Sequence, residues 1–590
     1  WNRKFIRKAN DRNPKLSAEY DYKHEKMLRA FNTLYAEYEI IKNLKFKTTF
    51  SYDYTTVKGE KWYDPRTSNG EDENGEVVKR IREYKKMVWS NTLSYLTTFN
   101  NIHHLDFLAG YEIDDTYNDY LSGEAYNFTT PDKHAISNGM KTVSVGGSDS
   151  RYRLVSYLSR LNYDYKNKYY LGASFRVDGS SRLHRDNRWG TFWSVSGAWR
   201  TIEEEFMQPV KDWLTDLRIR ASYGVNGTLP SDYFGYMGLS SISGGYLEQP
   251  GIQMSQIANP NLKWETNYNM NIGLDFGFWD RLNFTIEYYT RTTKNLLMDC
   301  PVSMTTGFSS YLMNIGEVKN KGIELTINST NIKIKDFSWN TTFNLGHNSN
   351  KVVKLDGEQT QIVSGTQIHK VGSSYRTFYV QEFAGINPET GNPLFYTNEL
   401  DENGNYIKEI TENSKNAQFI PYKHAEPTVN GGISNSLRYK WLDLNFLFSY
   451  QFGGYSYDTW AQKTEHGGYD SYANIPTYYR DSWKKPGDQT NIEVYMLGKS
   501  SSVSMHKITS SRRIHSTDYF RLKNITFGIT LPKEWTNKIN IGNVRFYASA
   551  SNLWTWAAYD NYDPEAVSAG SATQTTPPLK TVTFGLNINF

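Results

Sequence analysis

Strict alternation of apolar and polar residues is the feature that most limits what this chain can fold into. Over residues 262–276, the even positions are Leu262, Trp264, Thr266, Tyr268, Met270, Ile272, Leu274 and Phe276, and the odd positions are Lys263, Glu265, Asn267, Asn269, Asn271, Gly273 and Asp275. Successive side chains of a β-strand point to opposite faces, so this run predicts a strand with one apolar and one polar face. The run is much longer than the ~5–6 residues that are usual for strands in soluble sheets.

Similar runs recur along the whole chain. The alternation returns clearly in residues 282–289, 442–452, 543–551 and 581–590. All the runs together predict about 17 strands, whose boundaries such patterns fix to within about two to four residues. The predicted strands begin near residues 28, 44, 84, 102, 151, 169, 188, 214, 263, 282, 316, 337, 428, 442, 516, 542 and 580.

The connections between these strands alternate between short and long. The short ones are 41–43, 100–101, 166–168, 277–281 and 439–441, and the long ones are 58–83, 119–150, 227–262, 296–315, 351–427, 456–515 and 554–579. We also predict a small helix at 201–214 and a turn at 531–542 on the short side. Short turns on one side and long loops on the other are typical of outer-membrane barrels, whose long loops face the outside of the cell.

Composition favours a membrane barrel over a soluble protein. Aromatic residues make up 15% of the chain and hydrophobic residues only 38%, and the mean hydropathy is −0.66. The chain has no run of 18 apolar residues, so it contains no transmembrane helix. Barrel strands carry only about 10 residues of alternating pattern, which hydropathy does not detect. We therefore predict an all-β fold, a transmembrane antiparallel β-barrel.

Other functional classes find little support in the sequence. The net charge of +4, from 66 basic and 62 acidic residues, gives no basis for binding nucleic acid. Cys300 is the only cysteine, which rules out an internal disulfide. The nucleophile elbow, the Walker loop, the H-E-x-x-H motif and the dinucleotide fingerprint are all absent. We therefore predict no catalytic residue, no cofactor and no metal site.

The start of the chain and the strand count both point to further sequence upstream. The chain opens at Trp1 in charged sequence, without an initiator Met or a signal peptide. Bacterial single-chain barrels have an even number of strands, and an open sheet edge in lipid leaves main-chain groups unpaired. We therefore expect a truncated mature protein, in which the last strand pairs with a segment that precedes this chain.

Several blocks in the second half of the chain resemble the SusC/RagA family of TonB-dependent transporters from Bacteroidetes. They are LRIRASYGVN (217–226), NIGEVKNKGIEL (314–325), GINPETGNPLFY (385–396), EPTVNGGISNSLRYKWLDLNFLFSY (426–450), DYFRLKNITFGITLP (518–532), NLWTWAAYDNYDPE (552–565) and the terminal TVTFGLNINF. Their order and spacing are specific, and together they cover roughly residues 150–590. Residues before 150 fit the barrel pattern but carry little family signal.

The resemblance implies an architecture and a function. Such proteins are barrels of about 22 strands with an N-terminal plug. They import oligosaccharides or oligopeptides with energy from a TonB–ExbB–ExbD complex, and they work with a SusD-like surface lipoprotein that acts as a lid. Residues 1–590 would then be a partial barrel that lacks the plug and the first strands, and the aromatic Phe590 would be its barrel-assembly signal.

The long loops are the places where we expect ligand contacts. Residues 351–427 and 456–515 are predicted to be long extracellular loops. Aromatic rings of the second loop, which could stack on sugars or on peptide side chains, are the candidate ligand-binding residues: Trp460, Tyr469, Tyr472, Tyr478, Tyr479 and Trp483. The alternative for each ring is packing within the loop or against a lid. A passive porin and a β-rich surface adhesin are the alternative functions, and the sequence does not choose between a glycan and a peptide.

Overall fold

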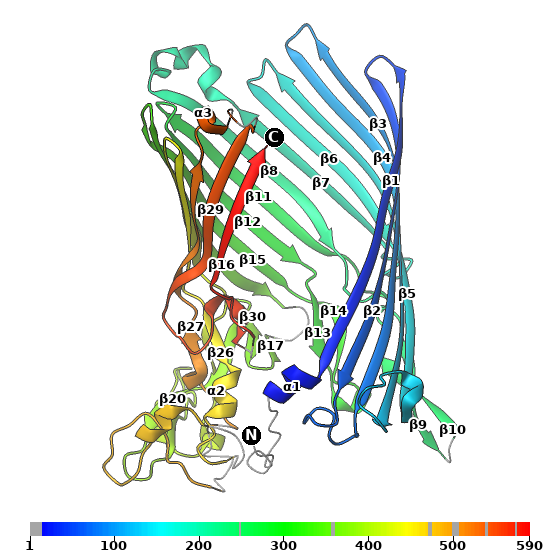
Figure 1. The fold of residues 1–590 in the computed structure, drawn as a ribbon, viewed down its shortest axis with the longest axis vertical. Helices are drawn as coiled ribbons and strands as arrows, with labels where there is room; N and C mark the ends of the chain where they lie inside the picture. The colour runs from blue at the N-terminus through cyan, green and yellow to red at the C-terminus, as the bar shows by residue number, and fades with distance from the viewer. Residues whose placement is uncertain are drawn as a thin grey trace. The chain divides into compact units, whose positions relative to one another are not determined.

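The computed structural model describes residues 14–246, 249–355, 360–469, 475–497, 505, 507–536, 538, 541–572 and 575–589. Seventeen of its strands belong to one large antiparallel sheet (Figure 1). The chain divides into two compact units: residues 1–195, 224–266 and 297–314 form the first, and residues 196–223, 267–296 and 315–590 form the second.

The strands of the large sheet follow one another along the chain. They are β1 (Tyr22–Ile41), β2 (Leu44–Tyr63), β3 (Glu76–Phe99), β4 (His103–Phe128), β5 (Gly139–Tyr165), β6 (Tyr169–Ser180), β7 (Trp189–Trp199), β8 (Leu214–Thr228), β11 (Glu265–Phe278), β12 (Leu282–Lys294), β15 (Glu317–Lys333), β16 (Phe337–Lys354), β24 (Val429–Tyr439), β25 (Leu442–Phe452), β28 (Tyr519–Thr530), β29 (Asn543–Ala557) and β32 (Thr581–Asn589).

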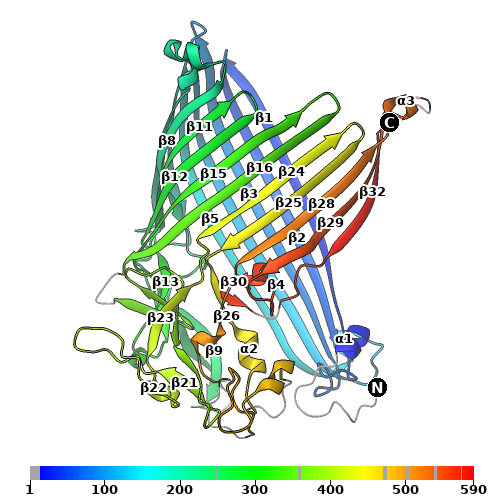
Figure 2. The same ribbon diagram turned by 90° about the vertical axis from the view of Figure 1, so that its left-hand side faces the viewer.

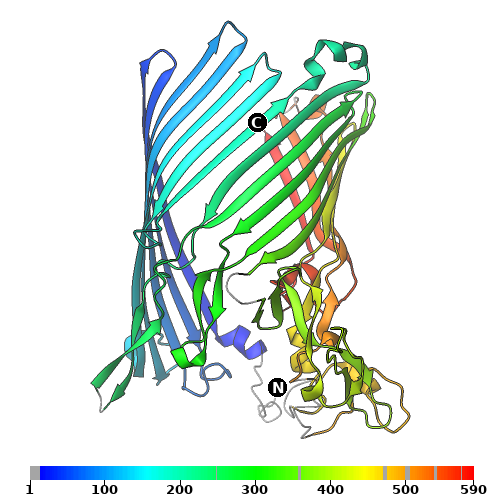
Figure 3. The ribbon, with the colours of Figure 1, turned by 180° about the vertical axis from the view of Figure 1, so that it is seen from behind.

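Within each unit, strands that are consecutive in the large sheet pair antiparallel. In the first unit β1 to β6 form an unbroken series of ladders. In the second unit the same holds from β12 through β15, β16, β24, β25, β28 and β29 to β32. Figures 2 and 3 show the strands of this second series lying side by side. The predicted antiparallel barrel wall is confirmed.

Smaller elements occupy the connections. The short strands are β9 (Leu239–Tyr246), β10 (Gln249–Gln256), β13 (Leu297–Pro301), β14 (Ser310–Asn314), β17 (Gln361–Ser364), β18 (Gln367–Lys370), β19 (Thr377–Gln381), β20 (Phe383–Ile386), β21 (Pro393–Tyr396), β22 (Ile410–Thr411), β23 (Phe419–His424), β26 (Tyr455–Asp458), β27 (Ile514–Ser516), β30 (Val567–Ser568) and β31 (Ser571–Ala572). The α-helices are α1 (Pro14–Tyr20), α2 (Thr459–Thr464) and α3 (Lys533–Thr536). The 3₁₀ helices are η2 (Ile136–Asn138), η3 (Thr201–Glu203), η4 (Glu205–Val210), η5 (Met304–Thr306), η6 (Ser414–Asn416), η7 (Thr477–Asp481), η8 (Ser511–Arg513) and η10 (Pro564–Ala566). Among the described residues no helix is both long enough and apolar enough to cross a bilayer.

The predicted strands all exist, but three of them begin earlier than the alternation indicated. β1, β3 and β5 begin at Tyr22, Glu76 and Gly139, against predicted starts near 28, 84 and 151. The predicted long connections 58–83 and 119–150 were therefore wrong in extent, since only 64–75 and 129–138 lie between strands. Main-chain hydrogen bonds continue the ladders into charged sequence, where the apolar signal has already ended.

The tight turns are made by residues in the left-handed region. Asn100 and Asn101 have φ of 51° and 57°, and Lys166 and Asn167 have φ of 54° and 53°. Two consecutive positive φ values are the geometry that matches the twist of an antiparallel hairpin. Asn tolerates this conformation better than other non-glycine residues, which explains its frequency at these turns. The predicted small helix at 201–214 is present as the two 3₁₀ turns η3 and η4.

Strand register confirms the two faces that the alternation predicted. Across β24, β25 and β28, Phe448 lies opposite Ile433 and Leu522, while the polar Asn445 lies opposite Ser436 and Thr526. The same apolar row continues through Phe527–Ala548, Ile525–Ala550, Ala548–Phe584 and Phe546–Leu586. A shift of one residue in any ladder would exchange the two faces of the shifted strand. The continuous apolar row therefore shows that the register of each ladder agrees with that of the next.

The apolar face is uncovered by protein. Phe584 is 80% exposed, Val582 58% and Trp554 51%, although all three are large apolar side chains. Soluble monomers rarely expose contiguous apolar surface of this kind, whereas a membrane barrel presents it to lipid. The apolar face of the sheet is therefore its lipid-facing side, and the polar face lines the lumen.

Two residues of the first alternating run depart from the lipid-facing assignment. Leu262 and Trp264 are buried and precede β11, which begins at Glu265. The Trp264 ring meets Phe192 edge to face at 5.2 Å, and its Nε1 donates to the carbonyl of Arg188 at 3.0 Å. The prediction that Trp264 belongs to the apolar face of a strand was wrong, because the residue precedes β11 and packs against Phe192 of β7.

The face assignment predicts opposite effects for two neighbouring substitutions. Phe446→Arg puts a charge on the lipid-facing row and should destabilise the inserted barrel by ~2–4 kcal/mol if the site lies near the midplane. Asn445→Arg adds the same side chain on the polar face and should leave folding unchanged. Folding yield into lipid vesicles measures both variants, and equal yields would contradict the assignment.

Candidate functional site

Charged groups on the polar face are organised around single carboxylates. Asp275 of β11 accepts hydrogen bonds from Arg218 at 3.1 Å, Arg220 at 3.0 Å and Thr285 at 2.8 Å. In the first unit, Asp115 is held in the same way by Arg151 and Arg153 at 2.7 and 2.8 Å. Such networks would be costly against lipid but are tolerated beside water. They show that the polar face is built to line an aqueous lumen.

Two pockets lie where this polar face meets the loops of the second unit, and we call them the strand-end pockets. The first, of about 340 Å³, is lined by Arg376, Ala425, Glu426, Pro427, Gln451, Thr517, Tyr519, Pro564, Glu565, Val567, Ala569 and Gly570. The second, of about 320 Å³, is lined by His347, Asn348, Ser349, Asn350, Ser374, His424, Glu426, Pro427 and Thr428. Glu426 and Pro427 belong to both.

The charges of the first strand-end pocket are compensated. Arg376 Nη1 lies 3.1 Å from Glu426 Oε1, and both side chains are more than one-third exposed. Glu565 accepts hydrogen bonds from Lys523 at 2.7 Å, from the Tyr519 hydroxyl at 3.0 Å and from Arg521. With both signs balanced and many amide and hydroxyl groups nearby, the pocket suits a polar solute with many hydrogen bonds.

Arg521 anchors the link that carries the lining residue Glu565. Its side chain is 2% exposed, and its Nη2 donates to Asp563 at 2.5 Å while its Nε donates to Thr555 at 2.9 Å. Arg521 lies on β28 and Asp563 in the link that follows β29, so the pair fastens that link to the barrel wall. A buried guanidinium needs such partners, because leaving it unpaired would cost several kcal/mol.

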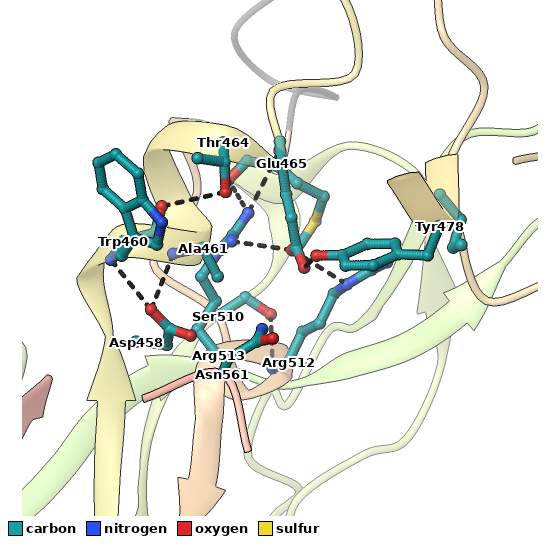
Figure 4. Close-up of polar contacts among 12 residues, drawn as sticks. Asp458, Trp460, Ala461, Thr464, Glu465, Tyr478, Ser510, Arg512, Arg513 and Asn561 are labelled. Atoms are coloured by element: carbon teal, nitrogen blue, oxygen red, sulfur yellow. Dashed lines mark hydrogen bonds and ion pairs between the residues drawn. The ribbon is translucent and has the colours of Figure 1, made fainter. Parts of the chain in front are cut away.

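The loop between β25 and β28 is organised around Glu465, as Figure 4 shows. Arg513, which is fully buried, donates from Nη1 to Glu465 Oε2 at 2.9 Å and from Nη2 to the carbonyl of Met505 at 3.2 Å. The Tyr478 hydroxyl donates to Glu465 Oε1. Burial, followed by this hydrogen bond, raises the pKa of Tyr478. We call Glu465, Tyr478, Arg512 and Arg513 the Glu465 cluster.

A second anchor of the same loop is Asp458. Its carboxylate caps α2 by accepting from the main-chain N–H groups of Trp460 at 3.0 Å and Ala461 at 2.8 Å. The Tyr559 hydroxyl donates to it at 3.0 Å, and the Tyr559 ring stacks on His515 at 3.7 Å. Burial lowers the pKa of His515, so the ring is held neutral in this stack.

Most of the predicted ligand-binding aromatics that the structure describes take part in packing within the loops. Tyr479 is buried, and Trp483 donates from Nε1 to the carbonyl of Pro388 at 2.7 Å. Tyr469 is half-buried, and Trp460, at 42% exposed, is the most accessible of the five that the structure describes. Tyr472 and the assembly-signal residue Phe590 lie outside the described residues. Ligand contact by these rings stays a prediction.

The sequence analysis did not predict the strand-end pockets. Asn348, Asn350 and Gln451 continue the polar face to the end of their strands, and Glu426 opens one of the family-like blocks. Their polar positions could have been read from the period-2 pattern. Arg376 could not, because it comes from a short turn before β19 that only the folded loop brings to the site. Among the described residues no group of His, Cys, Asp or Glu has an arrangement that could hold a metal ion.

The fold and its two faces define an outer-membrane β-barrel. The profile described as "TonB dependent receptor-like, beta-barrel" matches residues 2–406, and the chain belongs to that family. "TonB-dependent receptor P3" of Formosa agariphila is 31% identical over 94% of this chain and 57% of its own length. "TonB-dependent receptor SusC" of Bacteroides thetaiotaomicron is 29% identical over 88% of this chain and 51% of its own length.

A solved structure agrees with these relatives. The chain superimposes on the "RagAB peptide transporter" with a TM-score of 0.88 and 26% identity, covering 98% of this chain and 63% of the other. The resemblance to SusC/RagA transporters is thereby confirmed. The chain spans little more than half the length of the TonB-dependent receptors to which it is similar.

Removing one charge of the Glu465 cluster should loosen the loop. Glu465→Gln leaves the buried Arg513 without its carboxylate, and breaking such a pair typically costs ~3–5 kcal/mol. We expect faster hydrogen exchange in residues 507–516, with no change in the strands of the wall. Asp336→Asn is the control, because its 4.0 Å pair with Lys440 is half exposed and worth under ~1 kcal/mol. Similar exchange rates in the two variants would contradict the conclusion that the Glu465 cluster stabilises the loop.

The stack of His515 on Tyr559 should make the loop less stable in acid. The pKa of His515 is lowered from its ordinary value of 6.5, so below that value the unfolded loop binds a proton that the folded loop resists. Stability is therefore lost as the pH falls through and below ~6.5. Hydrogen exchange of β26 and β27, corrected for intrinsic rates, should show this loss, and His515→Gln should remove it. Constant protection in the native protein would refute the assignment.

Proposed function

We propose that this chain is the barrel part of an active importer that takes oligosaccharides or oligopeptides across the outer membrane. The observation that carries the proposal is the pairing of an exposed apolar face with a polar face that ends in the strand-end pockets. A lipid-embedded wall and a solute-binding lumen are the two parts that import requires. Membership of the TonB-dependent receptor-like family supports the same conclusion.

The chemistry of the pockets agrees with a polar oligomeric substrate. Opposite charges are paired at Arg376–Glu426 and at Lys523–Glu565, so a free ion would find no excess charge. Amide side chains of Asn348, Asn350 and Gln451 supply donors and acceptors for hydroxyl or peptide groups. The similarity to the RagAB peptide transporter supports a peptide substrate, whereas the chemistry of the pockets suits a glycan equally well.

Two partners follow from the proposal. A SusD-like surface lipoprotein would act as a lid on the segments 351–427 and 456–515, which we take to be extracellular. Both segments carry folded elements, such as the sheet β17–β18–β19–β23 and helix α2, and ordered long loops are usually functional. A stable lid complex would bury more than ~2,000 Å². The TonB–ExbB–ExbD complex would supply energy through an N-terminal plug.

Uptake and co-purification together test this function. In the native host, uptake of labelled oligosaccharides or oligopeptides should stop when the proton gradient is collapsed, and a lipoprotein should co-purify in mild detergent. Arg376→Ala with Glu426→Ala should reduce uptake at least tenfold, because the pocket loses its paired charges.

Lys335→Ala, in the turn between β15 and β16, is the matched control and should transport normally. Uptake that continues without the proton gradient, from a protein that elutes alone, would favour the passive porin. An absence of any uptake, with surface binding retained, would favour the adhesin.

A further inference from the structure

A third pocket lies on one face of the small sheet β17–β18–β19–β23, part of which is labelled in Figure 2. Its volume is about 520 Å³, within the ~300–1,000 Å³ range of small-molecule sites. Cross-strand pairs Gln361–Lys370 and Tyr379–Pro421 form one wall, and the hairpin from Asn398 to Tyr406 forms the other. It shares no lining residue with the strand-end pockets.

Aromatic surface is available in this cleft. The rings of Tyr379 and Phe419 lie 5.4 Å apart, with an angle of 36° between their planes. Phe419 is 40% exposed, Tyr406 42% and Leu400 62%, so none of the three is covered by the loops around it. Exposed rings that line a pocket offer flat, electron-rich faces to an apolar or C–H-rich partner.

The rim of the cleft is polar and uncharged overall. Gln361 and Gln418 are exposed, and their side-chain amides have no hydrogen-bond partner within the described part of the chain. Each amide can donate and accept, as a sugar hydroxyl also does. One cation, Lys370, and one anion, Glu399, balance each other, so the cleft attracts neither sign of ligand.

The walls are fixed before any ligand binds. Asp401 accepts from the N–H groups of Asn403 and Asn405 at 2.9 and 2.8 Å, which closes the hairpin. The buried Asn398 accepts from Lys408 at 2.9 Å and donates to Glu382 at 3.3 Å. A preformed site loses little conformational freedom on binding, so that even a ligand that makes weak contacts can bind.

Several main-chain groups of the cleft are already used. Gln418 N donates to Thr397 O at 2.8 Å, and Ile407 N donates to Glu399 O at 2.8 Å. Tyr379 N donates to Thr366 O at 2.8 Å. A peptide that bound by adding a strand would find these main-chain groups occupied, which favours recognition through side chains.

From these features we propose that the cleft binds a neutral oligosaccharide. The faces of two or three sugar rings would stack on Phe419, Tyr379 and Tyr406, and the hydroxyl groups would bond to Gln361 and Gln418. The site is independent of the import proposed above, since its residues are separate from Arg376 and Glu426. It gives the segment 361–424, on which the proposed lid would close, a role of its own in capturing sugars.

Binding of defined oligosaccharides to the intact protein tests this site. The protein is purified in lauryldimethylamine oxide, because sugar-based detergents would compete. Maltohexaose, cellohexaose, laminarihexaose and xylohexaose are each titrated by calorimetry and by saturation-transfer NMR. We expect at least one of them to bind, and Phe419→Ala and Tyr406→Ala to weaken that binding at least tenfold.

Tyr422→Ala is the matched control, because Tyr422 lies on the same strand, is 39% exposed and does not line the cleft. It should bind as the native protein does, and the heat-dependent gel mobility of all variants should show a folded barrel. The proposal is overturned if none of the four sugars binds, or if binding is insensitive to Phe419 and Tyr406. It is also overturned if a casein digest binds in a Phe419-dependent way and the sugars do not.

Discussion

Main-chain hydrogen bonding in a medium without water is the constraint on which the rest of this structure depends. Each N–H and C=O of a spanning segment must find a partner within the protein, because lipid supplies none. The consecutive ladders from β1 to β6 and from β12 to β32 meet this demand. Pairing then forces side chains to alternate, and alternation gives one chain a lipid face and a lumen face.

Electrostatics follow from that division. Carboxylates such as Asp275 and Asp115 can be accommodated only on the face that meets water, and each is paired with two guanidinium groups. Where the polar face reaches the loops, the same pairing builds the strand-end pockets through Arg376–Glu426 and Arg521–Asp563. The chemistry that a solute would meet is thus a continuation of the chemistry that stabilises the wall.

The loops of the second unit behave as a small folded domain. Buried Phe378, Val380 and Tyr457 form one apolar cluster, and Phe395, Ala417, Met505 and Ile508 form another. In each cluster the residues come from two different long links, 351–427 and 456–515, so these links fold together rather than as separate hairpins. Two of the candidate ligand-binding residues also belong to these loops: Tyr479 is buried, and Tyr478 donates to Glu465.

The sequence alone determined the barrel wall, namely its antiparallel strands, their two faces and the short turns. It could do so because the alternation of apolar and polar residues is a local property, visible within each strand separately. It placed the starts of β1, β3 and β5 too late, since ladders extend by main-chain bonds that carry no side-chain signal. It also placed Trp264 on the apolar face of a strand, because the packing of Trp264 against Phe192 involves a distant strand that no local pattern shows. Only the tertiary structure decided where Arg376, Glu465, Arg513 and Phe419 lie and which residues they contact. Contacts between loops that are distant in sequence depend on the fold of the whole chain, and no local sequence pattern contains that information.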